Sequence, residues 1–161
     1  MMKRDRRLYP LSWWHHHALM FAWRVKEALN RPTPGVEGVL AGKLRLFWPA
    51  DLEPHFRAEE EVLFTACGDV PGVGPALEEH RRLVEMVHVL IAGDAGREGN
   101  GADREGWLAF AALLTSHVRF EEDVLFPRME VLLPGGVLDR VGGELAERLP
   151  KGQDAGAVPW K

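Results

Sequence analysis

The sequence predicts an all-α fold: an antiparallel up-down-up-down four-helix bundle followed by a short C-terminal helix. Four long segments carry apolar residues at helical spacing, and short stretches rich in glycine and proline separate them. Strand signals are nearly absent, because no segment sustains an apolar/polar alternation and no Asn-Gly or Asp-Gly turn joins two apolar runs. Helices joined by short loops pack best against neighbours that run in the opposite direction.

The helical periodicity sets the order of the elements along the chain. The predicted bundle helices cover residues 11–30, 37–66, 75–92 and 103–130, and a shorter helix covers 137–148. The breaks fall at 31–35, 68–75, 93–101 and 134–136, and a loose tail follows from Pro150. Pro49 and Pro54 lie inside the second predicted helix, where each removes a backbone donor, so we expect a kink or break near 49–51.

Length and composition indicate one domain and exclude several classes of protein. The 161 residues, 46% of them hydrophobic, suit a single domain over 1–161, with the bundle core at about 8–133 and the short helix and tail at 134–161. The 20 basic and 24 acidic side chains are nearly balanced, so we expect no nucleic-acid partner. No apolar run approaches the roughly 18 residues of a membrane span. The single cysteine, Cys67, and the lack of a secretory signal after the basic start predict a cytoplasmic protein.

A short motif occurs twice in the chain. HFRAEEEVLF begins at His55 and HVRFEEDVLF begins at His117, and both contain the spacing His-x-x-x-Glu. Each copy is accompanied by one further histidine on a separate predicted helix, His15 for one half and His80 for the other. A pair of helices used twice explains this arrangement, and it predicts a bundle with approximate two-fold symmetry whose polar residues meet at the centre.

The helical angle of about 100° per residue shows which polar side chains face the core. Six of them fall on or near the apolar stripe of their own helix: His15, His55, Glu59, His80, His117 and Glu121. His16 takes the place of His15 if the first turn of its helix is wound differently. Glu60, Glu61 and Glu122 rotate away from the core.

This convergence predicts a metal site. An inward histidine is more often an ordinary core residue bonded to a backbone carbonyl, and a His/Glu pair four residues apart is often a surface ion pair. Neither interpretation explains six polar side chains that face one core, because an uncompensated buried carboxylate costs several kcal/mol. A cation supplies the compensation. Imidazole and carboxylate without thiolate favour iron, manganese or zinc, and six side chains exceed one tetrahedral zinc site, so two ions bridged by the glutamates fit best.

The residues in this order resemble the hemerythrin-like family, in its His-His-Glu cation-binding branch. The resemblance spans about residues 8–130 and rests on LSWWHHHAL, HFRAEEEVLF, LEEHRRL and HVRFEEDVLFP. It implies a four-helix bundle with two non-haem iron ions joined by an oxo or hydroxo bridge, which react with O2, peroxide or nitric oxide. Zinc or manganese can replace iron in a preparation.

The chain departs from the oxygen-carrying hemerythrins at two positions. Those proteins have a second histidine where this chain has Val84, and an aspartate where it has Glu122, while Glu121 has the better angle toward the core. By ligand count, about two coordination positions then stay open. We therefore expect sensing, scavenging or iron handling rather than oxygen transport. The alternatives are a peroxidase-like, catalase-like or NO-reducing enzyme at the same centre, and a structural site for one zinc or manganese ion.

Two neighbours of the predicted ligands are candidates to orient or shield the imidazoles. They are Glu79, next to His80, and Trp14, next to His15. Surface and packing roles are more common for such residues.

Overall fold

The computed structural model describes residues 3–31, 33–93 and 102–150, and all of the regular structure in these ranges is helical. The all-α prediction is confirmed, and each of the five predicted helices is present. In chain order the elements are η1 (Arg6–Leu8), α1 (Tyr9–Asn30), α2 (Val36–Phe47), η2 (Trp48–Leu52), α3 (Glu53–Ala58), η3 (Glu59–Phe64), α4 (Thr65–Cys67), α5 (Val73–Ala92), α6 (Ala102–Phe120), η4 (Glu121–Leu125), α7 (Phe126–Leu132) and α8 (Gly135–Arg148). The predicted loose tail at 151–161 lies outside the described residues.

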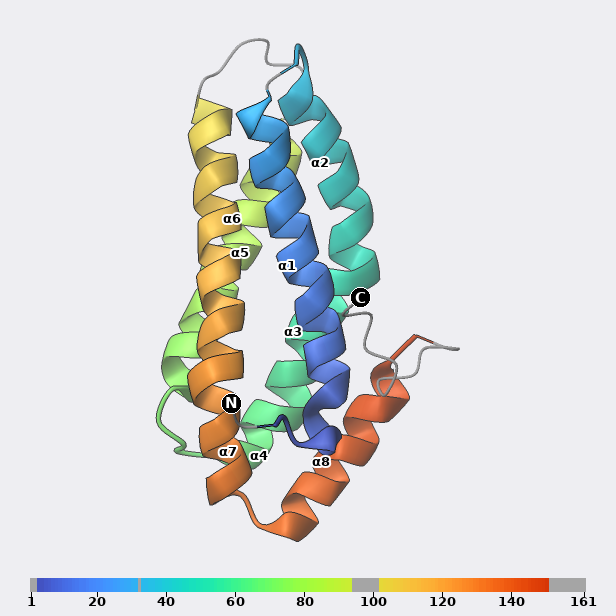
Figure 1. The fold of residues 1–161 in the computed structure, drawn as a ribbon, viewed down its shortest axis with the longest axis vertical. Helices are drawn as coiled ribbons and strands as arrows, with labels where there is room; N and C mark the ends of the chain where they lie inside the picture. Colours follow the sequence, from blue (N-terminus) through green and yellow to red (C-terminus); the bar gives the residue numbers. More distant parts are fainter. Residues whose placement is uncertain (1–2, 32, 94–101, 151–161) are drawn as a thin grey trace.

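The long helices lie along one common axis (Figure 1). α1 packs along α6, α5 also packs against α6, and α2 contacts α5. The short C-terminal helix α8 packs against η1 and α1. Within the described ranges, no helix combines the length and apolar character that crossing a lipid bilayer requires.

The second helical segment continues through the two prolines, so the expected break near 49–51 is absent. An irregularity does lie at this position: the π-helical turn η2, in which the backbone N–H of Glu53 donates to the carbonyl of Trp48. This wider turn accommodates Pro49, which has no N–H to donate. Asp51 accepts a hydrogen bond from the Nδ1 of His17 at 2.6 Å.

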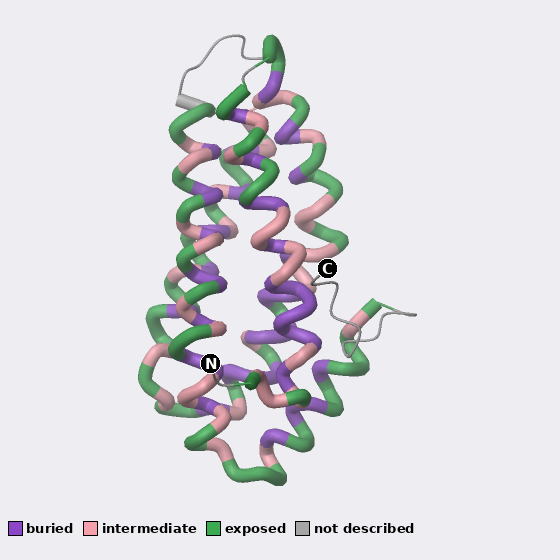
Figure 2. The backbone as a smooth tube through the Cα atoms, in the orientation of Figure 1, coloured by how far each residue is buried: buried purple, intermediate pink, exposed green. Residues whose placement is uncertain are grey.

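The buried apolar side chains form two clusters, which lie on opposite sides of a polar layer. In Figure 2 the buried positions, in purple, occur along the whole length of the bundle. On α1, the first cluster begins at Ala18 and the second ends at Trp14, so His15 lies between them. On α5, the boundary falls between Ala76 and Leu83 and contains His80. The same boundary crosses the other two segments. The fold thus brings the polar residues of four helical segments to one level along the bundle.

Candidate metal centre

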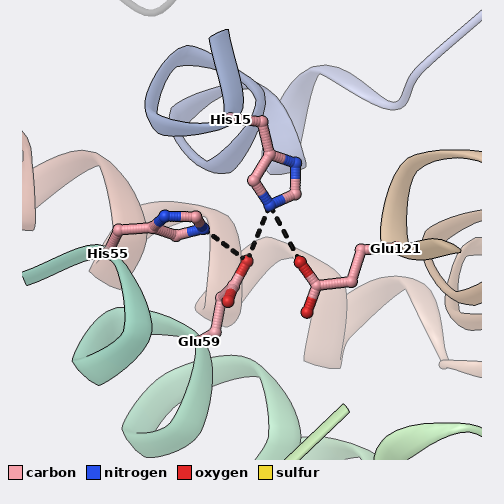
Figure 3. Close-up of side chains that lie close together, drawn as sticks. All are labelled: His15, His55, Glu59 and Glu121. Carbon is pink, nitrogen blue, oxygen red and sulfur yellow. Dashed lines mark hydrogen bonds and ion pairs between the residues drawn. The ribbon is translucent and has the colours of Figure 1, made fainter. Parts of the chain in front are cut away.

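The six side chains that the helical angle directs to the core are all buried at this level. None exposes more than 1% of its surface: His15, His55, Glu59, His80, His117 and Glu121. They form two groups, and within each group the potential ligand atoms all lie within 4.8 Å of one another. The groups are His15–His55–Glu59–Glu121 and Glu59–His80–His117–Glu121. Both groups contain the same two carboxylates. Figure 3 shows the first group, with three helical segments directing their side chains to one point.

The helix places each carboxylate beside a histidine of its own segment. The Nε2 of His55 lies 2.9 Å from the Oε1 of Glu59, and the Nε2 of His117 lies 3.2 Å from the Oε1 of Glu121, because residues four apart share a helix face. A π-helical stretch begins at Glu59 and another at Glu121. Such stretches are rare and are frequent at functional sites. The duplicated motif therefore repeats a backbone irregularity as well as a sequence.

Each of the two shared carboxylates faces both groups at once. For Glu59, Oε1 lies 3.0 Å from the Nε2 of His15 and Oε2 lies 3.0 Å from the Nε2 of His80. For Glu121, Oε2 lies 2.9 Å from the Nε2 of His15 and Oε1 faces His117. One oxygen of each carboxylate thus serves each group, which is the arrangement of a bridging ligand.

Several of these atoms are close together without forming hydrogen bonds. Among the described residues, no hydrogen-bond partner is found for five central atoms: Glu59 Oε2, His80 Nε2, His117 Nε2 and both carboxylate oxygens of Glu121. Buried polar atoms are almost always satisfied, so a group of unsatisfied ones needs an explanation. Nitrogen and oxygen lone pairs that converge within each group could hold a cation, and imidazole with carboxylate is a donor set for iron, manganese or zinc.

Two of the imidazoles have a further carboxylate on their outer side. The Nδ1 of His15 lies 2.6 Å from the Oε1 of Glu122, and the Nδ1 of His80 lies 2.7 Å from the Oε1 of Glu60. The helical angle correctly predicts that Glu60 and Glu122 lie off the centre, but it does not predict these contacts. The doubled glutamates of both motif copies were the available signal.

The two candidate outer neighbours both contact imidazoles of the centre. The carboxylate of Glu79 lies 3.5 Å from the Nδ1 of His117. The ring of Trp14 stacks on His55, with centroids 6.1 Å apart and planes 6° apart. Both residues point away from the histidine next to them in sequence, because adjacent helical residues face different directions.

The charges at the centre shift the pKa of several groups. Burial alone would lower the pKa of His15, but contacts with three carboxylates, Glu121 first, raise it well above its ordinary value. Burial likewise opposes ionisation of His117, yet the negative charge of Glu121 raises the pKa of this imidazole to about 10. Burial lowers the pKa of His55. Burial raises the pKa of Glu59, but His55 and the other imidazoles outweigh this effect and hold it well below its usual range. Without metal, protons on imidazoles therefore compensate the buried carboxylates.

Of the three consecutive histidines, only His15 belongs to a group of potential ligands, the first one. His16 is less buried, and the Nδ1 of His17 lies 2.6 Å from Asp51 on the side of the bundle. The alternative in which His16 replaces His15 requires a different winding of the first turn. α1 begins at Tyr9 and is regular through this region.

Comparison with known families agrees with this geometry. The family model described as the hemerythrin HHE cation binding domain matches residues 15–129, which include all six central side chains. Searches of curated proteins and of solved structures find no match. The match covers most of the chain, and families of this description bind cations with histidine and glutamate. The chain belongs to the hemerythrin HHE cation-binding domain family.

Proposed function

We propose that the protein binds two iron ions at this centre and responds to O2, peroxide or nitric oxide. The observation that carries the proposal is the sharing of Glu59 and Glu121 by the two groups of potential ligands. In this proposal His15 and His55 bind one ion, His80 and His117 bind the other, and the two carboxylates bridge them. Iron bound in this way supplies redox chemistry toward small oxidants and nitric oxide.

The surrounding side chains hold the imidazoles in place and exclude water. The ring of His15 stacks on Phe126 with centroids 5.3 Å apart, and the ring of His80 stacks on Phe56 at 4.1 Å. With all six central side chains buried, only small ligands can reach the centre without a rearrangement of the helices. This supports a diatomic molecule or peroxide as the ligand, rather than a larger substrate.

We further infer a single domain with the up-down-up-down antiparallel topology. Both apolar clusters include residues of α1 and α5, so the same helices contribute to both clusters, which supports one folding unit. The short connections between consecutive long helices favour antiparallel neighbours. We also propose a cytoplasmic location, which is supported by the buried and unpaired Cys67.

Metal analysis of the purified protein tests the proposal. Protein produced with added iron should contain about two irons per chain and absorb visible light, and the spectrum should change when peroxide or nitric oxide is added. One colourless ion per chain would overturn the di-iron proposal in favour of a structural zinc or manganese site. Catalytic turnover of peroxide or nitric oxide would assign an enzyme rather than a sensor or scavenger to the same centre.

A further inference from the structure

The second glutamate of each motif copy contacts the outer nitrogen, Nδ1, of a histidine on another helix. The copies contain the triplets Glu59–Glu60–Glu61 and Glu121–Glu122–Asp123. The first member of each triplet lies in the centre, and the third is exposed. The second member contacts the outer nitrogen of a histidine on another helix. Glu60 lies 2.7 Å from the Nδ1 of His80, and Glu122 lies 2.6 Å from the Nδ1 of His15.

We propose that Glu60 and Glu122 are positioning residues that prepare His80 and His15 for metal binding. The Nδ1–H of the imidazole donates to the outer carboxylate, and this contact keeps a proton on Nδ1. The Nε2 of the same ring faces the shared carboxylates and can then present its lone pair to a cation. The inference rests on the proposed metal centre, because an imidazole needs this orientation only if its inner nitrogen is a ligand.

The duplicated motif therefore encodes two functions in adjacent residues. In each copy, one glutamate supplies a shared central carboxylate and the next one fixes an imidazole on a different helix. This second contact ties α5 to the segment that contains Glu60, and α1 to the segment that contains Glu122. The symmetry of the sequence thus extends beyond the inner ring of the site.

The two positioning contacts differ in how firmly they are held. Glu122 also accepts hydrogen bonds from the hydroxyl of Ser12 at 2.8 Å and from the guanidinium of Arg4 at 3.0 and 3.1 Å, and its side chain is 25% exposed. Glu60 is 43% exposed, so water competes for its carboxylate. Because additional hydrogen bonds hold Glu122 and its side chain is less exposed, we expect its contact with His15 to contribute more to metal affinity than the contact of Glu60 with His80. Arg4, which makes two of these bonds, lies outside the residues that match the family, 15–129.

Zinc binding by alanine variants tests the proposal, because zinc is diamagnetic and allows NMR of the loaded protein. Glu122→Ala and Glu60→Ala should each weaken zinc binding by about 10- to 100-fold in competition with a chelator, with the larger loss for Glu122→Ala. The matched controls are Asp123→Ala and Glu61→Ala, the exposed third members of the same triplets, and these should bind zinc like the parent protein.

Two further measurements separate positioning from a general structural effect. Glu60→Gln keeps an oxygen that accepts the Nδ1–H, so it should recover most of the affinity that Glu60→Ala loses. In zinc-loaded protein, the hydrogen-bonded Nδ1–H resonance of His80 should be visible in the parent and in Glu60→Gln and absent in Glu60→Ala. The same resonance of His15 should disappear in Glu122→Ala.

Defined outcomes would overturn the inference. If alanine variants bind zinc as tightly as the controls, or Glu60→Gln is as weak as Glu60→Ala, the outer carboxylates do not position the imidazoles. If Glu122→Ala does not fold, the variants of the half-buried Glu60 still decide the question. If the parent protein binds neither zinc nor iron, the proposed metal centre fails instead, so the two failures are distinguishable.

Discussion

Replacing Glu59 with glutamine removes the one negative charge that the two groups of potential ligands share at this position, and it leaves the size of the side chain almost unchanged. The carboxylate of Glu59 lies 3.0, 2.9 and 3.0 Å from the Nε2 atoms of His15, His55 and His80. Because Glu59 belongs to both groups of potential ligands, Glu59→Gln should weaken both proposed ion sites. We expect the variant to retain well below one ion per chain.

A histidine variant that affects only one group gives the metal content with which Glu59→Gln is compared. His55→Ala removes a ligand from the first group and leaves the second, Glu59–His80–His117–Glu121, complete. This variant should therefore retain about one ion per chain, against about two in the parent protein, because all ligands of the second group are still present. Removing one partner of a buried ion pair also costs about 3–5 kcal/mol of folding stability in the metal-free protein.

The assay is iron or zinc content of purified, folded variants, combined with urea unfolding followed by circular dichroism. Glu61→Gln is the matched control, because it changes the same functional group two residues away on an exposed side chain. If Glu59→Gln and His55→Ala retain equal amounts of metal, the carboxylate of Glu59 does not serve both groups. If Glu59→Gln retains two ions, the shared-carboxylate reasoning is wrong.

Three further predictions follow from charges and backbone geometry. Glu121 raises the pKa of His117 to about 10 from the ordinary 6.5, so the pair makes its full contribution to the stability of the metal-free protein below pH 6.5 and loses it as the pH rises toward 10. Urea unfolding in the presence of a chelator should show this decrease in the free energy of unfolding. Arg4→Ala should lower the free energy of unfolding by about 1.5–3 kcal/mol, because it removes charged hydrogen bonds to two partly buried carboxylates. Gly72→Ala should cost about 1–3 kcal/mol, because Gly72 has φ 109° and a Cβ there would lie 3.0 Å from Leu125 Cδ1.

The controls for these predictions are close in the chain. In the metal-loaded protein, the free energy of unfolding should not decrease in this way as the pH rises toward 10. If the free energy of unfolding of the metal-free protein does not change over this range, the pKa assignment is wrong. Arg6→Ala, at an exposed position, should leave the urea midpoint unchanged. Gly74→Ala has open space at its Cβ and lies within α5, so it should be neutral or slightly stabilising. Equal effects of the two glycine variants would count against the steric argument.

The helices and the inward set of polar residues could be predicted because both depend on local periodicity. The apolar spacing placed the second segment at 37–66, and the structure has continuous helix from Val36 to Cys67. The same angle directed Glu59 inward and Glu60 outward, as the structure has them. The π-helical turns were not predicted, because a uniform angle of about 100° per residue assumes a regular α-helix and does not resolve wider turns of five or six residues.

Sequence by itself determined the all-helical class, the two copies of the motif and the six side chains that face the core. Only the tertiary structure decided which oxygen of Glu121 faces which histidine, that Glu122 lies behind His15, and that Arg4 reaches Glu122 from the start of the chain. The periodicity of a helix gives the direction of a side chain about its own axis. It does not give the rotation or the axial level of that helix relative to its neighbours, and contacts between helices depend on both.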